Sequence, residues 1–241
     1  MNILAKVSYK GTNYQGWQTQ IGGNTIQDVI QEKLSQILNT PITIYGSGRT
    51  DSGVHAYGQY FNFKIEKDID LNKLRYSLNS LLPIDIHINS LKEVDDDFHA
   101  RFSAKGKKYQ YVIRLGENDP FSNELTYNFV RPLDVELFKK AIVSFSGRHN
   151  FMNFTSKETD EDNFIRNIQV EVVVNDNFIY VNFTGDGFMR YMIRYMVGTA
   201  LEIGEKRLEL DFIDKNLDTK IRKIVSYKAP SQGLFLLDVI Y

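Results

Sequence analysis

Two kinds of hydrophobic spacing follow one another in the first hundred residues. Apolar side chains alternate with polar ones, as in strands with one buried face, at residues 3–9, 55–63 and 84–88. Apolar side chains recur at helical spacing at residues 26–38 and 71–81. Thr25 is a suitable N-cap for the first helix, and Pro83 ends the second. With a short apolar run at 42–45 as a further strand, the pattern predicts the order βαββαβ.

The rest of the chain repeats this order. Segments typical of strands lie at residues 109–115, 168–174, 178–184 and 234–241. One helix has apolar positions from 137 to 145 behind a capping Asp134, and another, apolar on most sides, is predicted at 188–203. The sequence Asn175-Asp176-Asn177 predicts a turn between two of the strands.

Two successive βαββαβ halves are most simply ferredoxin-like units of the α/β (α+β) class, with mostly antiparallel sheets. We expect an N-terminal domain at residues 1–100 and a C-terminal domain at residues 101–241. The two halves are expected to be joined side by side, with the active-site cleft between them. This division depends on the pattern of elements, because the halves share no detectable sequence repeat.

The composition is that of an ordinary packed protein, with 241 residues, 42% of them hydrophobic, and no cysteine. The lack of cysteine excludes a disulfide framework, a thiolate metal site and a cysteine nucleophile. It also favours a reducing compartment, so we expect a cytoplasmic protein. The longest apolar stretch, 188–203, contains Arg190, Arg194 and Glu202 and is too charged to cross a membrane.

Basic residues are concentrated in two parts of the chain, although the formal net charge is only -1. Residues 101–114 contain five lysines and arginines and no acid, and residues 220–228 contain four and no acid. Taken singly, each run is most simply a solvated surface. Together they also suit a polyanion such as nucleic acid, which the charge balance neither requires nor excludes.

The most unusual segment is the stretch 46–56, which has three glycines in eight positions around Arg49 and Asp51. Glycine permits tight turns and the close approach of a ligand, so the segment is suited to presenting Asp51. A phosphate-binding P-loop is excluded because its Lys-Ser/Thr ending is missing and a strand, not a helix, follows. Taken alone, Asp51 is most simply a turn residue that binds nearby backbone N–H groups.

Five segments in a fixed order change this interpretation. They are 14–18 (YQGWQ), 48–56 (GRTDSGVHA), 98–104 (FHARFSA) leading to Lys108-Tyr109, 192–194 (MIR) and 229–236. Together they resemble the motifs of the TruA-type tRNA pseudouridine synthases over essentially the whole chain. Three departures from the usual pattern are Ser52 in place of alanine, Tyr195 in place of asparagine and Lys107-Lys108 in place of two arginines.

The resemblance implies that the protein converts uridine to pseudouridine at positions 38, 39 and 40 of the tRNA anticodon stem-loop, without a cofactor. In this reaction the bond between ribose C1′ and base N1 breaks, and C1′ becomes bonded to C5 instead. Such chemistry needs a carboxylate, and Asp51 is the catalytic residue that the motif implies. The sequence leaves open whether Asp51 attacks the sugar or the base, or removes a sugar proton.

The resemblance also implies the residues that surround Asp51. An arginine corresponding to Arg194 pairs with the aspartate, a tyrosine corresponding to Tyr109 stacks on the target base, and Arg49 fills the gap left by the flipped uridine. From the residues alone, simpler roles are a solvent-directed helix arginine, a packed strand tyrosine and a surface loop charge. The other expected substrate-binding residues are His55, Lys107, Lys108 and Leu234.

Arg190 and Arg194 are four residues apart in the predicted helix, so we expect them on one face. Two cations at the edge of an apolar helix are unfavourable unless an anion faces them. Asp51 and RNA phosphate are both suitable anions.

The histidines do not have the spacing of a metal site, so we expect no metal ion. His55 and His99 belong to the motifs and are expected to hold loops through hydrogen bonds. Tyr14 and Trp17 are expected to be core aromatics of the first strand and its turn.

The family resemblance adds a homodimer that binds the anticodon arm of tRNA. Two alternatives are also compatible with the sequence. One is a paralogue that modifies a uridine in another RNA, and the other is a non-catalytic RNA-binding module, which the basic segments alone support equally well.

Overall fold

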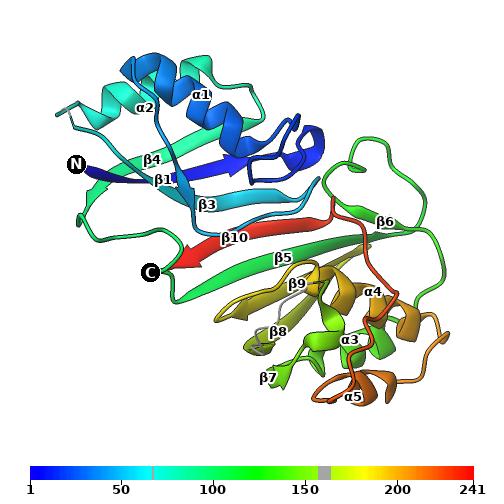
Figure 1. Cartoon of the computed structure of the whole chain (residues 1–241). Coiled ribbons are helices and arrows are strands. Elements are labelled where there is room, and N and C mark those ends of the chain that lie inside the picture. The colour runs from blue at the N-terminus through cyan, green and yellow to red at the C-terminus, as the bar shows by residue number, and fades with distance from the viewer. Residues whose placement is uncertain (67, 157–163) are drawn as a thin grey trace. The chain divides into compact units, whose positions relative to one another are not determined.

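The computed structural model describes residues 1–66, 68–156 and 164–241 and has the predicted α+β architecture, with mostly antiparallel strand pairing (Figure 1). The chain forms two compact units. Unit 1 comprises Met1–Lys105 and Phe235–Tyr241, and unit 2 comprises Gly106–Leu234. None of the described helices is both long and apolar enough to cross a membrane.

Unit 1 has the strand order of a ferredoxin-like fold. Its elements are β1 (Asn2–Tyr9), η1 (Gly11–Asn13), α1 (Ile26–Leu38), β2 (Tyr45–Gly46), β3 (His55–Lys64), α2 (Leu71–Leu81), β4 (Ile86–Val94) and most of β10 (Leu234–Ile240). β1 lies between β3 and β4 and is antiparallel to both. The short β2 pairs antiparallel with Phe61 and Asn62 of β3. The order β4-β1-β3-β2 agrees with the predicted first half.

The periodicity of unit 1 explains which of its faces are buried. Ile3, Ala5 and Val7 of β1 are completely buried, because alternate residues of a strand share one face. α1 and α2 lie on the same side of these strands (Figure 1). Their buried apolar residues include Ile30, Leu34, Leu74 and Leu78. The helical spacing thus gives each helix one face toward the strands.

The ends of these elements follow local hydrogen bonds. Thr25 Oγ1 accepts a hydrogen bond from Asp28 N (3.2 Å) and caps α1 as predicted. The alternation predicts a strand from residue 84, but β4 begins only at Ile86. Ile86 N donates to Pro83 O (3.0 Å) in a turn, which leaves Ile84 fully exposed.

Unit 2 has the antiparallel strand order β5-β9-β8-β7. Its elements are β5 (Gly106–Leu115), β6 (Tyr127–Phe129), α3 (Val135–Val143), β7 (Gly147–Asn150), η2 (Met152–Phe154), β8 (Ile165–Asn175), β9 (Phe178–Gly185), α4 (Met192–Gly204) and α5 (Phe212–Asn216). β6 pairs with β5 in parallel. α3 and α4 pack against each other (Figure 1), and Asp134 caps α3 as predicted.

The long apolar helix of unit 2 begins later than its pattern predicts. The pattern indicates residues 188–203, whereas α4 begins at Met192. The preceding Tyr191 has a left-handed backbone (φ 61°), which cannot be part of an α-helix. Arg190 therefore precedes the helix, and the expectation that Arg190 and Arg194 share one helical face is wrong.

The last strand, β10, belongs to unit 1 for most of its length. Phe235 and Leu236 pair in parallel with the start of β3. The hydrophobic pattern predicts this strand as part of the segment 101–241 but cannot predict which strand it pairs with. The partner of a strand depends on contacts between residues far apart in the chain.

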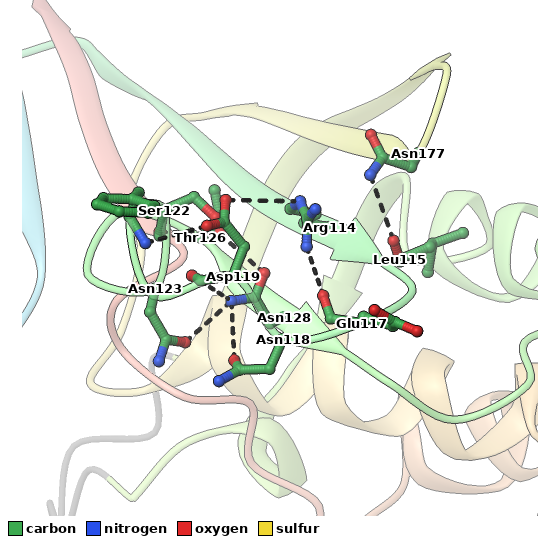
Figure 2. Close-up of polar contacts among 11 residues, drawn as sticks. Arg114, Leu115, Glu117, Asn118, Asp119, Ser122, Asn123, Thr126, Asn128 and Asn177 are labelled. Atoms are coloured by element: carbon green, nitrogen blue, oxygen red, sulfur yellow. Dashed lines mark hydrogen bonds and ion pairs between the residues drawn. The ribbon is translucent and has the colours of Figure 1, made fainter.

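The connection between β5 and β6 is held by its own polar side chains, as Figure 2 shows. The Asn128 amide nitrogen donates to Asn118 Oδ1 (3.2 Å) and to Asn123 Oδ1 (3.0 Å). Arg114 Nε lies 4.0 Å from an Asp119 carboxylate oxygen. These contacts give a defined shape to a loop of unit 2 that has little regular secondary structure.

Candidate active site

Asp51 lies in the loop that connects β2 to β3 in unit 1 (residues 47–54, the Asp51 loop). Its side chain is half-buried, while Arg49 is exposed. Val54 N donates to Asp51 O (3.1 Å) and closes a turn. Within the turn Gly53 has φ 77°, a left-handed conformation that glycine adopts without steric cost.

The segment that follows η1 holds the Asp51 loop on both sides of the aspartate. Trp17 N donates to Thr50 O (3.1 Å), and Gly53 N donates to Tyr14 O (3.4 Å). The side chains of Tyr14 and Trp17 are buried, as predicted for core aromatics. Their backbone groups support the Asp51 loop, a role that the sequence pattern does not indicate.

Two glycines allow these backbones to come close together. Gly16 has φ 89°, and a Cβ atom at this position would lie 2.5 Å from Thr50 O. A Cβ atom on Gly11 would lie 2.0 Å from Val54 O. Any other residue at either position would therefore displace the Asp51 loop or the segment that supports it.

Buried polar side chains support the same loop from beneath. Ser47 Oγ donates to Gln59 Oε1 (2.6 Å), and Gln59 Nε2 donates to Gly48 O (2.9 Å). The hydroxyl groups of Tyr9 and Thr50 share a hydrogen bond of 2.8 Å. Burial raises the pKa of Tyr9, so its phenol is neutral at physiological pH and the bond needs no charge.

His55 links three parts of unit 1. It is buried at the start of β3, and its Nδ1 accepts a hydrogen bond from Gly11 N (3.0 Å). Its ring stacks on Phe235 of β10 (4.7 Å between centroids), which in turn stacks on the exposed Tyr57 (5.4 Å). These contacts give His55 a place in the scaffold of the loop, and its contact with substrate stays a prediction.

Arg49 lies on the exposed side of the Asp51 loop. Its Nε donates to Gln18 Oε1 (3.2 Å), which joins the 48–56 motif to the 14–18 motif. A planar guanidinium in this position is suited to stacking on a nucleobase. Its insertion in place of the flipped uridine stays a prediction.

In unit 2, β5 carries three of the predicted residues. Tyr109 is buried opposite Phe183 of β9, and the edge of its ring meets the ring of Phe188 (5.1 Å, 76°). Lys107 is half-buried on the same face of the strand as Tyr109, whereas Lys108 is exposed on the other face. Only one of the two lysines thus shares a face with the tyrosine.

Arg194 is held in the first turn of α4. Its Nε donates to Ala229 O (2.8 Å), and Ala229 N donates to Arg194 O (2.9 Å). The guanidinium carbon lies 5.2 Å from the centre of the Tyr191 ring. The side chain is half-buried and fixed, rather than extended freely into solvent.

The segment 229–234 is the first part of the 229–236 motif, and hydrogen bonds connect it to both α4 and β5. Tyr111 of β5 is completely buried and donates a hydrogen bond to Pro230 O (2.7 Å). Burial raises the pKa of Tyr111 well above its usual value, although the positive charge of Arg194 acts in the opposite direction. Leu234 is buried at the end of this segment.

The predicted site residues are distributed over both units. Unit 1 contains Asp51, Arg49 and His55, and unit 2 contains Lys107, Lys108, Tyr109, Arg194 and Leu234. Each group is held within its own unit, and the pairing of Asp51 with Arg194 stays a prediction. In the part of the chain that the structure describes, no three His, Asp or Glu side chains form a group suited to a metal ion.

Comparisons with known proteins agree with the motifs. A family profile described as tRNA pseudouridine synthase matches residues 5–103 and 141–241. The chain is 38% identical to the tRNA pseudouridine synthase A of Staphylococcus aureus (strain MRSA252), over 98% of this chain and 90% of the relative. The same identity is found with the tRNA pseudouridine synthase A of Geobacillus sp. (strain WCH70), over 99% and 98% of the two chains.

A further relative is the tRNA pseudouridine synthase A 1 of Protochlamydia amoebophila (strain UWE25), which is 38% identical over 98% of this chain and 94% of its own. The similarity therefore includes the segments that carry the Asp51 loop, β10 and α4. Because the family profile covers most of the chain and the relatives align over nearly their whole length, the chain belongs to the tRNA pseudouridine synthase family and is an isomerase.

Proposed function

We propose that this enzyme converts the uridines at positions 38, 39 and 40 of the tRNA anticodon stem-loop to pseudouridine, with Asp51 as the catalytic carboxylate. The C1′–N1 bond breaks, the base turns, a C1′–C5 bond forms, and the proton lost from C5 is replaced by one gained at N1. The product is an isomer of the substrate. The reaction therefore needs no oxidant, reductant or energy source.

The observation that carries this proposal is the construction of the Asp51 loop. The backbone is bonded to Tyr14 and Trp17 on either side of the aspartate, and Gly16 makes this close approach possible. A reactive group held in this way loses little freedom when the substrate binds, which favours the reaction. The half-buried position of Asp51 leaves part of its side chain open to a substrate.

Two residues of unit 2 have the chemistry that such a site needs. Arg194 Nε is bonded to Ala229 O, so we expect its Nη groups to bind the Asp51 carboxylate. This pairing lowers the pKa of a carboxyl group and keeps it ionised. We expect the ring of Tyr109 to stack on the flipped base.

Arg49 is the proposed replacement for the flipped base within the RNA stack. Removal of a uridine from the stack costs a few kcal/mol, and a guanidinium that stacks on the neighbouring bases recovers part of this energy. We expect Lys107 and Lys108 to bind backbone phosphates, which position the RNA without reading its sequence.

We also propose that the enzyme works in the cytoplasm as a homodimer whose two subunits contact one tRNA. A chain of 241 residues without cysteine agrees with a reducing compartment. The homodimer follows from the family resemblance.

The test is a map of pseudouridine at single-nucleotide resolution. Wild-type protein and Asp51→Asn are each incubated with unmodified tRNA transcripts, and the pseudouridines are located by chemical labelling. We expect product at positions 38 to 40 with the wild type and none with Asp51→Asn. Product at other positions would overturn the substrate assignment, and product formed by Asp51→Asn at the wild-type rate would overturn the assignment of the aspartate.

A further inference from the structure

Three cations of unit 2 lie around the ring of Tyr191, and we call these four residues the Tyr191 cluster. Lys228 Nζ lies 4.3 Å from the ring centre, the guanidinium carbon of Arg190 4.8 Å and that of Arg194 5.2 Å. All three distances are within the range of a cation–π interaction. Because each charge lies within 5.2 Å of the same ring centre, any two of them are at most about 10 Å apart. This separation is about one Debye length in 0.1 M salt, so the charges repel one another.

Two of these cations have no carboxylate partner in the part of the chain that the structure describes. Arg190 and Lys228 are exposed, and neither forms an ion pair with any acid among residues 1–66, 68–156 and 164–241. Another exposed lysine of unit 2, Lys215, is paired with Asp211 (2.7 Å). A group of like charges without an acidic partner among the described residues is suited to binding an anion from another molecule.

The backbone at the centre of the cluster is held in an unusual conformation. Tyr191 has φ 61° and ψ 3°, a left-handed geometry that is uncommon for a residue with a side chain. Arg190 O accepts hydrogen bonds from Thr155 Oγ1 (3.0 Å) and Ser156 N (3.3 Å), and Arg190 Nη2 donates to Tyr191 OH (3.0 Å). Anchored strain of this kind is concentrated at binding and catalytic sites.

We infer that Arg190 and Lys228 form a clamp for one phosphate group of the RNA backbone, and that the ring of Tyr191 holds the two cations together. Arginine and lysine are the usual partners of phosphate. Because Arg190 and Lys228 lie 4.8 Å and 4.3 Å from one ring centre, they are at most about 9 Å apart, a separation that one phosphate group with a hydrogen bond to each can bridge. The cluster contains no amide side chain, and its one ring is already in contact with the three cations, so we assign it to the RNA backbone.

The position of the clamp also indicates which phosphate it takes. Arg194 shares the ring of Tyr191 and is the proposed partner of the catalytic aspartate. A phosphate bound by Arg190 and Lys228 is therefore one that flanks the target uridine. This last step rests on the proposed function, whereas the presence of a phosphate clamp does not.

The experiment measures the affinity of the full chain for tRNA as a function of salt. The variants are Arg190→Gln, Lys228→Gln and the double variant, with Lys215→Gln as a control that removes an exposed lysine of the same unit whose charge is already paired. For a single shared phosphate we expect the slope of log K against log salt to fall by about 0.7 to 0.9 in the double variant. We expect the double variant to bind tRNA about tenfold more weakly than the wild type. This decrease should be smaller than the product of the decreases caused by the two single variants, because both cations contact the same phosphate.

The phosphate itself is identified with neutral linkages. Full-length tRNA is assembled by ligation with one methylphosphonate at a time in the anticodon arm. We expect one linkage next to the target uridine to weaken binding by the wild type about tenfold and to have no further effect on the double variant. If every linkage has the same effect on both proteins, or if the salt slope of the double variant equals that of Lys215→Gln, the clamp is wrong.

The tyrosine is tested by two substitutions. Tyr191→Phe keeps the ring and should keep the salt slope, whereas Tyr191→Leu should lower it as the double variant does. Equal slopes for Tyr191→Leu and the wild type would overturn the role of the ring. Pseudouridine formation by the wild type is measured separately, so that a failure of the proposed function is distinguished from a failure of the clamp.

Discussion

The Asp51 loop and the Tyr191 cluster hold functional side chains in place through different interactions. The loop depends on backbone hydrogen bonds, neutral buried side chains and glycines that let two segments touch. The cluster depends on one aromatic ring, around which the fold collects three positive charges. The contacts of the Asp51 loop determine where the aspartate lies, and they tolerate almost no added volume. The contacts of the Tyr191 cluster keep positive charges close together, and they depend on an aromatic ring.

Among substitutions outside the catalytic carboxylate itself, the largest effect should come from Gly16→Ala. The new Cβ would meet Thr50 O at 2.5 Å in a residue with φ 89°, so the Asp51 loop must move. We expect a loss of about 3 kcal/mol in the free energy of unfolding and a decrease of about 100-fold or more in kcat/KM for tRNA. Urea unfolding and pseudouridine formation at low substrate concentration measure the two quantities.

Gly22→Ala is the matched control for this prediction. Gly22 also has a positive φ (69°), but its added Cβ would have no atom within 4 Å. The variant should lose only about 1 kcal/mol from the left-handed backbone and keep its activity within about twofold. If Gly16→Ala behaves like Gly22→Ala, close approach to the Asp51 loop is not what requires glycine at position 16.

A smaller effect is expected from the buried amide beneath the loop. Gln59→Leu removes the hydrogen bonds of the amide to Ser47 Oγ, Gly48 O and Tyr60 N. We expect a loss of about 2 kcal/mol in stability, measured by urea unfolding. Adding Ser47→Ala should cost less than Ser47→Ala does in the wild type, because the hydrogen bond between the two side chains is already lost. A double variant whose loss equals the sum of the two single losses would contradict the pairing.

Tyr191→Leu should separate the two regions most clearly, because it acts on activity and hardly on stability. The ring is half-buried and the cations around it are exposed or partly exposed, so unfolding by urea should change by less than about 1 kcal/mol. We expect kcat/KM to fall about tenfold at 0.1 M salt and the difference to shrink as salt rises, since screening weakens charge interactions. An effect that is independent of salt would argue against an electrostatic role.

The smallest effect is expected for Tyr9→Phe, which removes the hydroxyl group that is bonded to Thr50 Oγ1 and to the Gln59 side chain. The ring remains packed against Trp17 (6.0 Å between centroids), so the loss should be about 1 kcal/mol in stability. Activity should change by no more than a few-fold in the tRNA assay. A loss as large as that of Gly16→Ala would mean that the side-chain bond, not the backbone contact, determines the position of the Asp51 loop.

Much of the fold follows from periodicity and local signals. The alternation at 3–9 and 55–63, the helical spacing at 26–38 and 71–81, and the capping residues Thr25 and Asp134 all agree with the structure. The start of α4 does not, because the left-handed backbone of Tyr191 is not encoded in hydrophobic spacing. The pairing of β10 with β3 is also absent from the pattern, since it joins residues nearly two hundred positions apart.

The candidate site also combines features that the sequence predicts with features that depend on contacts between distant segments. Asp51 and the motifs around it can be identified from the sequence, because three glycines close to an arginine and an aspartate form an unusual local pattern. The support of Thr50 by Trp17, and the closeness that requires Gly16, appear only when distant segments meet. The Tyr191 cluster is of the second kind, because Lys228 reaches the ring from a segment that is far away in the chain.

The most direct test of the central claim is the single-turnover rate of Asp51→Asn together with its affinity for tRNA. A neutral amide of the same size removes the carboxylate and keeps the shape of the loop. We predict no detectable pseudouridine and a Kd within about threefold of the wild type, because the phosphate contacts are unchanged. Pseudouridine formed at the wild-type rate would contradict the account.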